Sequence, residues 1–209
     1  MKLVTFNEEN NTWIEDTTKN AYSYVDTSVP GNENKSEWAN AEVTVDGITS
    51  YFVWIPRYAY KITYYTNEDK TEISETPTAY GTIDVKFING TGNIAADEEG
   101  TICKYASENP DVTKDYVVHP AFTDEVDNGG WDSQLAGIWI GKYEASLANK
   151  NDGSNIIPND SNANILLSDD ADKTIVTKPG YSSWRWIAIG NMYTNAYNYA
   201  RELESHMLK

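Results

Sequence analysis

The chain has 209 residues, of which 16 are basic and 32 acidic, so its formal net charge at pH 7 is −16. A surface this negative repels phosphate groups, which excludes nucleic acid as a partner and disfavours anionic membranes. The single cysteine, Cys103, excludes an internal disulfide. A helix needs about 18 consecutive apolar residues to cross a bilayer, and no apolar run in this chain approaches that length, so we expect no membrane insertion.

The length suits one domain, and the aromatic content is unusual, with seven Trp and fifteen Tyr against four Phe. Trp and Tyr join a large apolar body to a polar tip and favour strand faces and interfaces. Three blocks concentrate these residues, namely Tyr51–Ile62, Gly137–Ser146 and Ser182–Ile189. We expect the three blocks to meet in one shared core, with the polar connectors forming irregular loops.

Residues 1–50 are mostly polar and form a predicted N-terminal segment with short strands. Strand-like residues occur at Leu3–Phe6, Thr12–Ile14 and Glu42–Val45. The pair Asp46-Gly47 is typical of a two-residue hairpin turn. A hairpin should therefore lead into the first aromatic block.

The first block predicts two strands, Ser50–Ile55 and Tyr58–Tyr64, interrupted at Pro56 because proline cannot donate to a strand ladder. Further on, Thr82–Ile88 alternates apolar and polar residues, which predicts a half-buried strand. Its inward-facing members should be Ile83, Val85 and Phe87.

The second half of the chain contains fewer regular signals. Tyr116–Phe122 is a short apolar run, and Gly137–Ser146 predicts one buried strand. The polar, low-complexity residues 149–164 predict a loop. A short strand is expected at Ile175–Thr177 before the Pro179-Gly180 pair.

One helix is predicted near the C-terminus. Apolar residues recur there with a period of about 3.6, from Met192 to Met207. Asn191 is the predicted N-cap, and Asn195 is placed on the solvent-facing side.

No spacing of residues indicates catalysis. The chain has two histidines, and His119 precedes a proline in an apolar run, where an imidazole bonded to the backbone is expected. Glu144 lies in the apolar second block, where we expect a structural ion pair with Arg57 or Arg185. The sequence therefore predicts a protein that is not an enzyme.

One acidic loop has the ligand types that calcium uses. Calcium binds carboxylate and amide oxygens from flexible loops, but the spacing here differs from that of an EF-hand. A bound calcium ion and a solvated acidic loop are both compatible with the pattern, and the second is favoured. The four candidate ligands are Asp124, Asp127, Asn128 and Asp132.

Aromatic residues in polar surroundings could form a platform for a ligand. Sugar rings stack on Trp and Tyr faces, while Asn and Asp side chains bond to hydroxyl groups. The alternative is that these rings simply cover strand faces. The candidate ligand-binding residues are Trp13, Trp38, Tyr64, Tyr65, Tyr80 and Trp131.

Four patches together resemble a known family, the formylglycine-generating-enzyme-like (C-type-lectin-like) surface and phage proteins of Firmicutes. The patches are Val53–Ile62, Tyr116–Phe122, Gly137–Ser146 and Pro179–Lys209. Within them, Gly141–Ser146 matches the family's K-x-E-containing strand, and Trp184–Ala200 matches the element that leads into its helix. The cysteine pair of the sulfatase-modifying members has no counterpart here.

The resemblance implies an α+β, strand- and loop-rich C-type-lectin-like domain over residues 51–209, with a C-terminal helix and possible incompleteness at its C-terminus. The expected function is that of a non-enzymatic surface or virion protein that binds glycan or protein through aromatic and Asn-rich loops. The alternative is a structural subunit of a phage particle or extracellular filament, with copies of itself as partners. Either function places the protein outside the cell, on the cell surface or in a virion.

Overall fold

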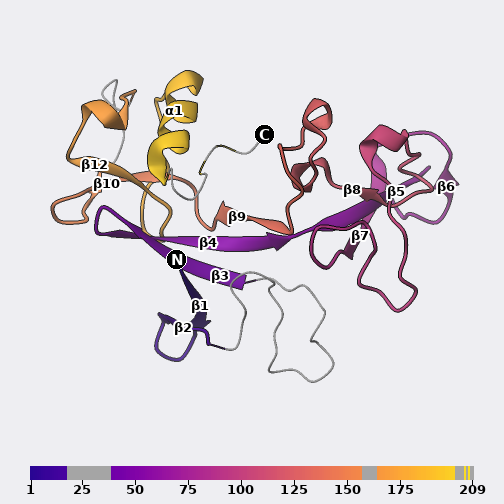
Figure 1. The fold of residues 1–209 in the computed structure, drawn as a ribbon, viewed down its shortest axis with the longest axis horizontal. Helices are drawn as coiled ribbons and strands as arrows, with labels where there is room; N and C mark the ends of the chain where they lie inside the picture. The colour runs from indigo at the N-terminus through magenta and orange to yellow at the C-terminus, as the bar shows by residue number, and fades with distance from the viewer. Residues whose placement is uncertain (18–38, 157–163, 201–204, 206, 208–209) are drawn as a thin grey trace. The chain divides into compact units, whose positions relative to one another are not determined.

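The chain folds as two compact units, with unit 1 made of Met1–Asp16, Ala39–Trp54 and Trp139–Lys209, and unit 2 of Thr17–Trp38 and Ile55–Ile138 (Figure 1). The computed structural model describes residues 1–17, 39–156, 164–200, 205 and 207. These residues contain open sheets and one α-helix, so the predicted strand-rich α+β class is confirmed. None of the helices within the described residues combines the length and apolarity that a bilayer crossing requires.

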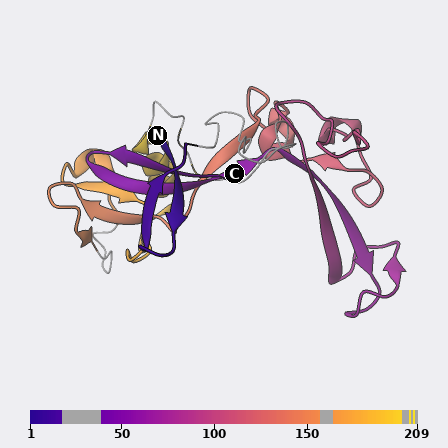
Figure 2. The ribbon, with the colours of Figure 1, turned by 90° about the horizontal axis from the view of Figure 1, so that it is seen from below.

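Unit 1 contains two sheets and the helix (Figures 1 and 2). The larger sheet has the strand order β2-β1-β3-β4-β9, with β1 (Lys2–Asn7), β2 (Thr12–Glu15), β3 (Ala39–Val45), β4 (Ile48–Pro56) and β9 (Gly137–Gly141). The smaller sheet has the order β11-β10-β12, with β10 (Ser146–Asn149), β11 (Asn155–Ile156) and β12 (Lys173–Val176). The 3-10 helix η5 (Leu167–Asp169) and the helix α1 (Ile189–Tyr199) complete the unit.

The core of unit 1 forms where the β3–β4 hairpin packs on the smaller sheet. Ile48 is buried against Ala148 and Val176. The hairpin turn is Asp46-Gly47, and both residues have positive φ, 52° and 77°, as a type I′ turn requires. The predicted hairpin is thus confirmed, and its short polar turn places β4 directly over β10 and β12.

Unit 2 is built around β5 (Tyr58–Tyr65), which pairs with β7 (Tyr80–Phe87) along one edge. Its other edge pairs with β6 (Ile73–Ser74) and β8 (Val117–Val118). Long loops contain the 3-10 helices η1 (Ala106–Glu108), η2 (Pro120–Phe122) and η3 (Val126–Asn128). The core of the unit is the buried cluster of Ala59, Ile88, Ala95, Cys103 and Val118.

The expectation of one shared core holds for part of the chain. In unit 1 the first two blocks meet through the rings of Trp54 and Trp139, whose centroids are 5.4 Å apart. The third block contacts the second, because the Trp184 backbone N–H donates to the Ala145 carbonyl at 2.7 Å. It is not part of a shared core, since Trp186 is 68% exposed and Ile189 79% exposed. Residues 55–62 of the first block belong to unit 2, which has its own core, so the expectation is wrong for them. The boundary expected at residue 50 falls inside β4.

Several predicted elements differ from the structure in their limits. The second block is not one strand, because the chain bends after Gly141 and β10 begins at Ser146. The helix begins at Ile189 with Ala188 as its N-cap, so Asn191 is not the cap. Asn195 is buried rather than solvent-facing, since its amide donates to Ile165 and accepts from the N–H of Leu167.

The β7 prediction is correct for the strand but wrong for its buried face. Ile83 is 67% exposed and Val85 43% exposed. The opposite face, which carries Asp84 and Lys86, is the one that the following loop covers. Asp97 of this loop neutralises Lys86, and Tyr116 donates to Asp84, so the loop packs on the polar face although Asp84 itself is exposed.

Candidate functional site

Trp13, one of the candidate platform residues, lies within an aromatic cluster on the larger sheet of unit 1. Its ring stacks on that of Tyr51 with centroids 5.0 Å apart, and Phe6 meets it edge-on at 5.1 Å. The Lys142 ammonium lies 5.4 Å from the Trp13 centroid and donates to Asn40 Oδ1 at 2.7 Å. These neighbours hold the ring in place on a half-exposed sheet face.

Three further candidates meet at one end of the β5–β7 hairpin. Tyr65 pairs across the strands with Tyr80, and Tyr64 pairs with Gly81 on the opposite face. The Tyr64 ring lies close to Gly81, where an added Cβ would be 3.6 Å from Tyr64 Cδ1. The structure therefore brings Tyr65 and Tyr80 together on one face and places Tyr64 on the other. Trp38 lies outside the described residues.

The loop with Trp131 and the acidic candidates is shaped by its own backbone. Trp131 Nε1–H donates to the Ala121 carbonyl at 2.7 Å, which fixes the ring. Gly130 is required here, because a Cβ would lie 2.5 Å from the Thr123 carbonyl oxygen. These two contacts define the shape of the loop.

The calcium candidates of this loop all lie at its exposed surface, namely Asp124, Asp127, Asn128 and Asp132. Asp124 accepts a hydrogen bond from Gln134 at 2.6 Å. Among the described residues, no three His, Cys, Asp or Glu side chains come together as a metal site would require. Calcium binding stays a prediction.

His119 lies where the sequence placed it, half-buried among the rings of Tyr58, Tyr60 and Phe122. Its Nδ1 accepts a hydrogen bond from the Ala121 N–H at 3.2 Å, and burial lowers its pKa. Glu144 is exposed and accepts from the Ser183 hydroxyl, so the expected buried ion pair is wrong.

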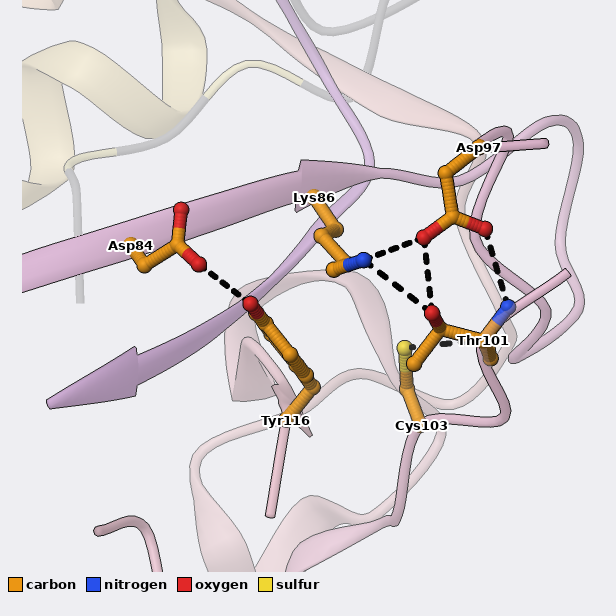
Figure 3. A network of polar contacts seen from close by, with 6 residues as sticks. All are labelled: Asp84, Lys86, Asp97, Thr101, Cys103 and Tyr116. Atoms are coloured by element: carbon orange, nitrogen blue, oxygen red, sulfur yellow. Dashed lines mark hydrogen bonds and ion pairs between the residues drawn. The ribbon is translucent and has the colours of Figure 1, made fainter. Parts of the chain in front are cut away.

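Figure 3 shows a polar network around Lys86 that covers the inner face of β7. The Lys86 ammonium donates to Asp97 and, at 3.1 Å, to Thr101, while Tyr116 donates to Asp84. The hydrogen bond from Lys86 lowers the pKa of Asp97, and the same bond raises the pKa of Lys86. Both groups are charged at neutral pH, so the ammonium is no nucleophile. This network attaches the loop to β7.

Cys103 lies beside this network and is fully buried. Burial raises the pKa of its thiol, which keeps it in the unreactive protonated form. We expect a thiol reagent such as Ellman's reagent to modify Cys103 at least about a thousandfold more slowly than free cysteine, because reaction needs local opening. Absorbance recordings with and without urea measure this, and rapid labelling of the native protein would contradict the burial.

A polar pocket opens in unit 1 where three loops meet. It encloses about 360 Å³ and is called here the Lys178 pocket. The hairpin turn of β3 and β4 forms one side, and the β10–β11 loop forms another. The pocket is lined by Gly47, Ile48, Thr49, Lys150, Asn151, Asp152, Gly153, Lys178 and Tyr181.

Backbone and side-chain bonds fix the β10–β11 loop in the shape that this pocket needs. The Gly153 N–H donates to the Asn149 carbonyl at 2.8 Å, and Gly153 has φ +70°, which favours glycine. The Tyr181 hydroxyl donates to the Gly153 carbonyl. Lys150 pairs with Asp46 at 2.9 Å and so connects this loop to the hairpin turn.

The pocket combines one unpaired cation with one ionised carboxylate. Lys178 lies 5.5 Å from the Tyr181 ring centroid and forms no ion pair within the described part of the chain. Asp152 Oδ1 accepts the Ser154 N–H at 2.9 Å, and hydrogen bonds from Ser154 lower the pKa of this carboxyl. The Lys178 ammonium and the Asn151 amide, which also donates to Asp172 at 3.3 Å, can bond to hydroxyl groups of a ligand.

Sequence reasoning did not single out the residues of this pocket. Its residues extend along the chain from Gly47 to Tyr181, and no local motif joins them. The available signals were the Asp46-Gly47 turn and the Asn- and Asp-rich β10–β11 connection. Comparisons with protein-family models, curated proteins and solved structures found no match to this chain.

Proposed function

We propose that this protein is a non-enzymatic binding protein that recognises a saccharide in the Lys178 pocket. The observation that supports this most is the lining of the pocket, which includes Lys178, Asp152, Asn151 and Tyr181 and so offers an ammonium, a carboxylate, an amide and an aromatic ring. A vicinal diol both donates and accepts hydrogen bonds, so a neighbouring ammonium and carboxylate suit it. The volume of about 360 Å³ is at the small end of ligand sites, as a monosaccharide unit requires.

The setting that we propose is the surface of a cell or a virion. Support comes from the resemblance of four sequence patches to formylglycine-generating-enzyme-like, C-type-lectin-like proteins of such surfaces. The acidic composition, with net charge −16, also suits a protein that remains dispersed outside a cell. The aromatic residues Trp13, Tyr64, Tyr65 and Tyr80 would then be secondary contacts for longer glycans or for protein ligands.

A glycan array followed by titration calorimetry tests the pocket. Replacing Lys178 by Gln or Asp152 by Asn removes a charged hydrogen-bonding group and should weaken binding at least about tenfold, since such bonds contribute about 1.5–3 kcal/mol. Lys114→Gln, at an exposed lysine of unit 2, is the matched control and should bind like the unchanged protein. Absence of binding on the array, or equal affinity of all variants, would contradict the proposal.

The alternative function, a structural subunit of a phage particle or extracellular filament, is favoured by a different observation. β7 exposes apolar side chains at a sheet edge that no described strand occupies. Such an edge serves for assembly rather than for binding small ligands.

A further inference from the structure

The outer edge of β7 has free backbone groups. β7 is the last strand of its sheet, and its ladder with β5 pairs Lys86 with Ala59 and Asp84 with Lys61. On the outer side, the Phe87 carbonyl accepts the Ala96 N–H at 2.8 Å. Backbone groups point alternately to the two sides of a strand, so those of Gly81, Ile83 and Val85 share the outer side with Phe87. Among the described residues, no strand pairs with them.

The side chains at this edge favour a second strand as the occupant. Ile83 and Val85 are exposed and β-branched, and the one acidic residue, Asp84, lies opposite Lys61 of β5. Natural edge strands are normally protected by proline, a bulge or unbalanced charge, and the segment from Gly81 to Phe87 contains no proline. A locally neutral, apolar segment in a chain of charge −16 is where two copies can approach with least repulsion.

We infer that β7 pairs antiparallel with β7 of a second copy, with Ile83 opposite Ile83. This register places Gly81 opposite Val85 and Tyr80 opposite Lys86, so no like charges face each other. A register centred on Asp84 would place two carboxylates opposite each other, which is destabilising. A register centred on Val85 would pair Ile83 with Phe87 and would need the Phe87 carbonyl as a hydrogen-bond acceptor. That carbonyl already accepts the Ala96 N–H.

The pairing is two-fold symmetric and closed, so it produces a dimer and not a fibre. It joins the two hairpins into one sheet of order β5-β7-β7-β5, in which the apolar faces of both copies are continuous. Because the two copies repel each other through their net charge, salt should strengthen the dimer. The inference does not depend on saccharide binding, since the Lys178 pocket lies in unit 1 and β7 in unit 2.

Sedimentation equilibrium over a range of protein and NaCl concentrations tests the pairing. The unchanged protein should form a dimer that tightens with salt. Ile83→Lys should weaken it about a hundredfold or more, because it removes two apolar side chains from the interface and sets two lysines opposite each other. Ile73→Lys, at an equally exposed isoleucine on β6, is the control and should leave the dimer unchanged.

A cross-linking experiment tests the same pairing independently, in case Ile83→Lys affects folding. In this register the two Ile83 residues form a hydrogen-bonded antiparallel pair. The Cα atoms of such a pair are about 5.5 Å apart, which is within the range that a disulfide spans. Ile83→Cys should therefore form a disulfide-linked dimer on mild oxidation, and Ile73→Cys should not. A protein that stays monomeric at all concentrations, or equal cross-linking by both variants, would overturn the inference. Lys178→Gln should still dimerise, which separates this test from that of the pocket.

Discussion

Replacing Arg57 by Met should lower the free energy of unfolding of unit 2 by about 3–5 kcal/mol, the largest effect that we expect from one substitution, because each buried carbonyl left without a donor costs about 1–3 kcal/mol. Arg57 is fully buried, and burial lowers the pKa of its guanidinium. Its guanidinium donates to the carbonyls of Gly92 (2.7 Å), Leu135 (3.1 Å) and Phe122, and it forms no ion pair within the described residues. Methionine fills much of the space but leaves the Gly92 and Leu135 carbonyls without a donor, while the Phe122 carbonyl keeps only the Leu135 N–H at 2.8 Å.

Hydrogen exchange of backbone amides measures this effect separately in each unit. In Arg57→Met, protection should fall for amides of β5 such as Ile62, while amides of β10 and β12 keep theirs, because they belong to unit 1. Arg185→Met is the matched control at the other arginine of the described residues, which is exposed, and should change stability by no more than about 0.5 kcal/mol. Equal protection of β5 in the two variants would contradict the role of Arg57.

Replacing Thr177 by Val should lower the stability of unit 1 by about 2 kcal/mol. The two side chains have nearly the same shape, so the change removes hydrogen bonds with little loss of packing. Thr177 is 4% exposed, and its hydroxyl donates to the Tyr143 carbonyl at 2.7 Å and accepts the Tyr143 N–H at 2.9 Å. Valine would leave both backbone groups of Tyr143 unsatisfied where the chain bends between β9 and β10.

Thr174→Val provides a close control for this prediction. Thr174 lies on the neighbouring strand β12 and is also 4% exposed, but its hydroxyl makes no hydrogen bond within the described residues. Urea unfolding should therefore show Thr174→Val to be neutral or slightly stabilising. Similar effects of the two substitutions would mean that the bonds to Tyr143 contribute nothing beyond burial.

The sequence predicted elements whose cause is local. Asp46-Gly47 predicted the hairpin because both residues tolerate the positive φ of a type I′ turn. Pro56 predicted the interruption of the first block, and β5 begins two residues later at Tyr58. Alternation predicted β7. In each case the chemistry of a few adjacent residues was sufficient.

The sequence failed where a distant segment decides the environment. Ile83 and Val85 form the more apolar face of β7, yet the loop that contains Asp97 and Thr101 covers the other face, because it can neutralise Lys86 there. Asn195 has a polar side chain, yet it is buried because the backbone at Ile165 and Leu167 supplies its hydrogen bonds. Helical periodicity describes one element and contains no information about such partners.

The candidate site was the least predictable part. Candidate aromatics such as Tyr65 and Tyr80 were chosen for their polar sequence context, and their proximity depends on the β5–β7 register. The Lys178 pocket depends on a hairpin turn, a loop fixed by Gly153 and the segment that contains Tyr181. Residues from three loops become neighbours only through the packing of β4 on β10 and β12, which no short motif encodes.

Backbone NMR titration with free monosaccharides, including N-acetylglucosamine, galactose and glucuronic acid, tests the proposed function most directly. We expect at least one sugar to cause saturable shift changes confined to amides that line the Lys178 pocket, such as Thr49, Asn151 and Gly153, and to lose this effect in Lys178→Gln. If no sugar shifts these amides, or if the shifts occur at Tyr64, Tyr65 and Tyr80 instead, the pocket is not the binding site.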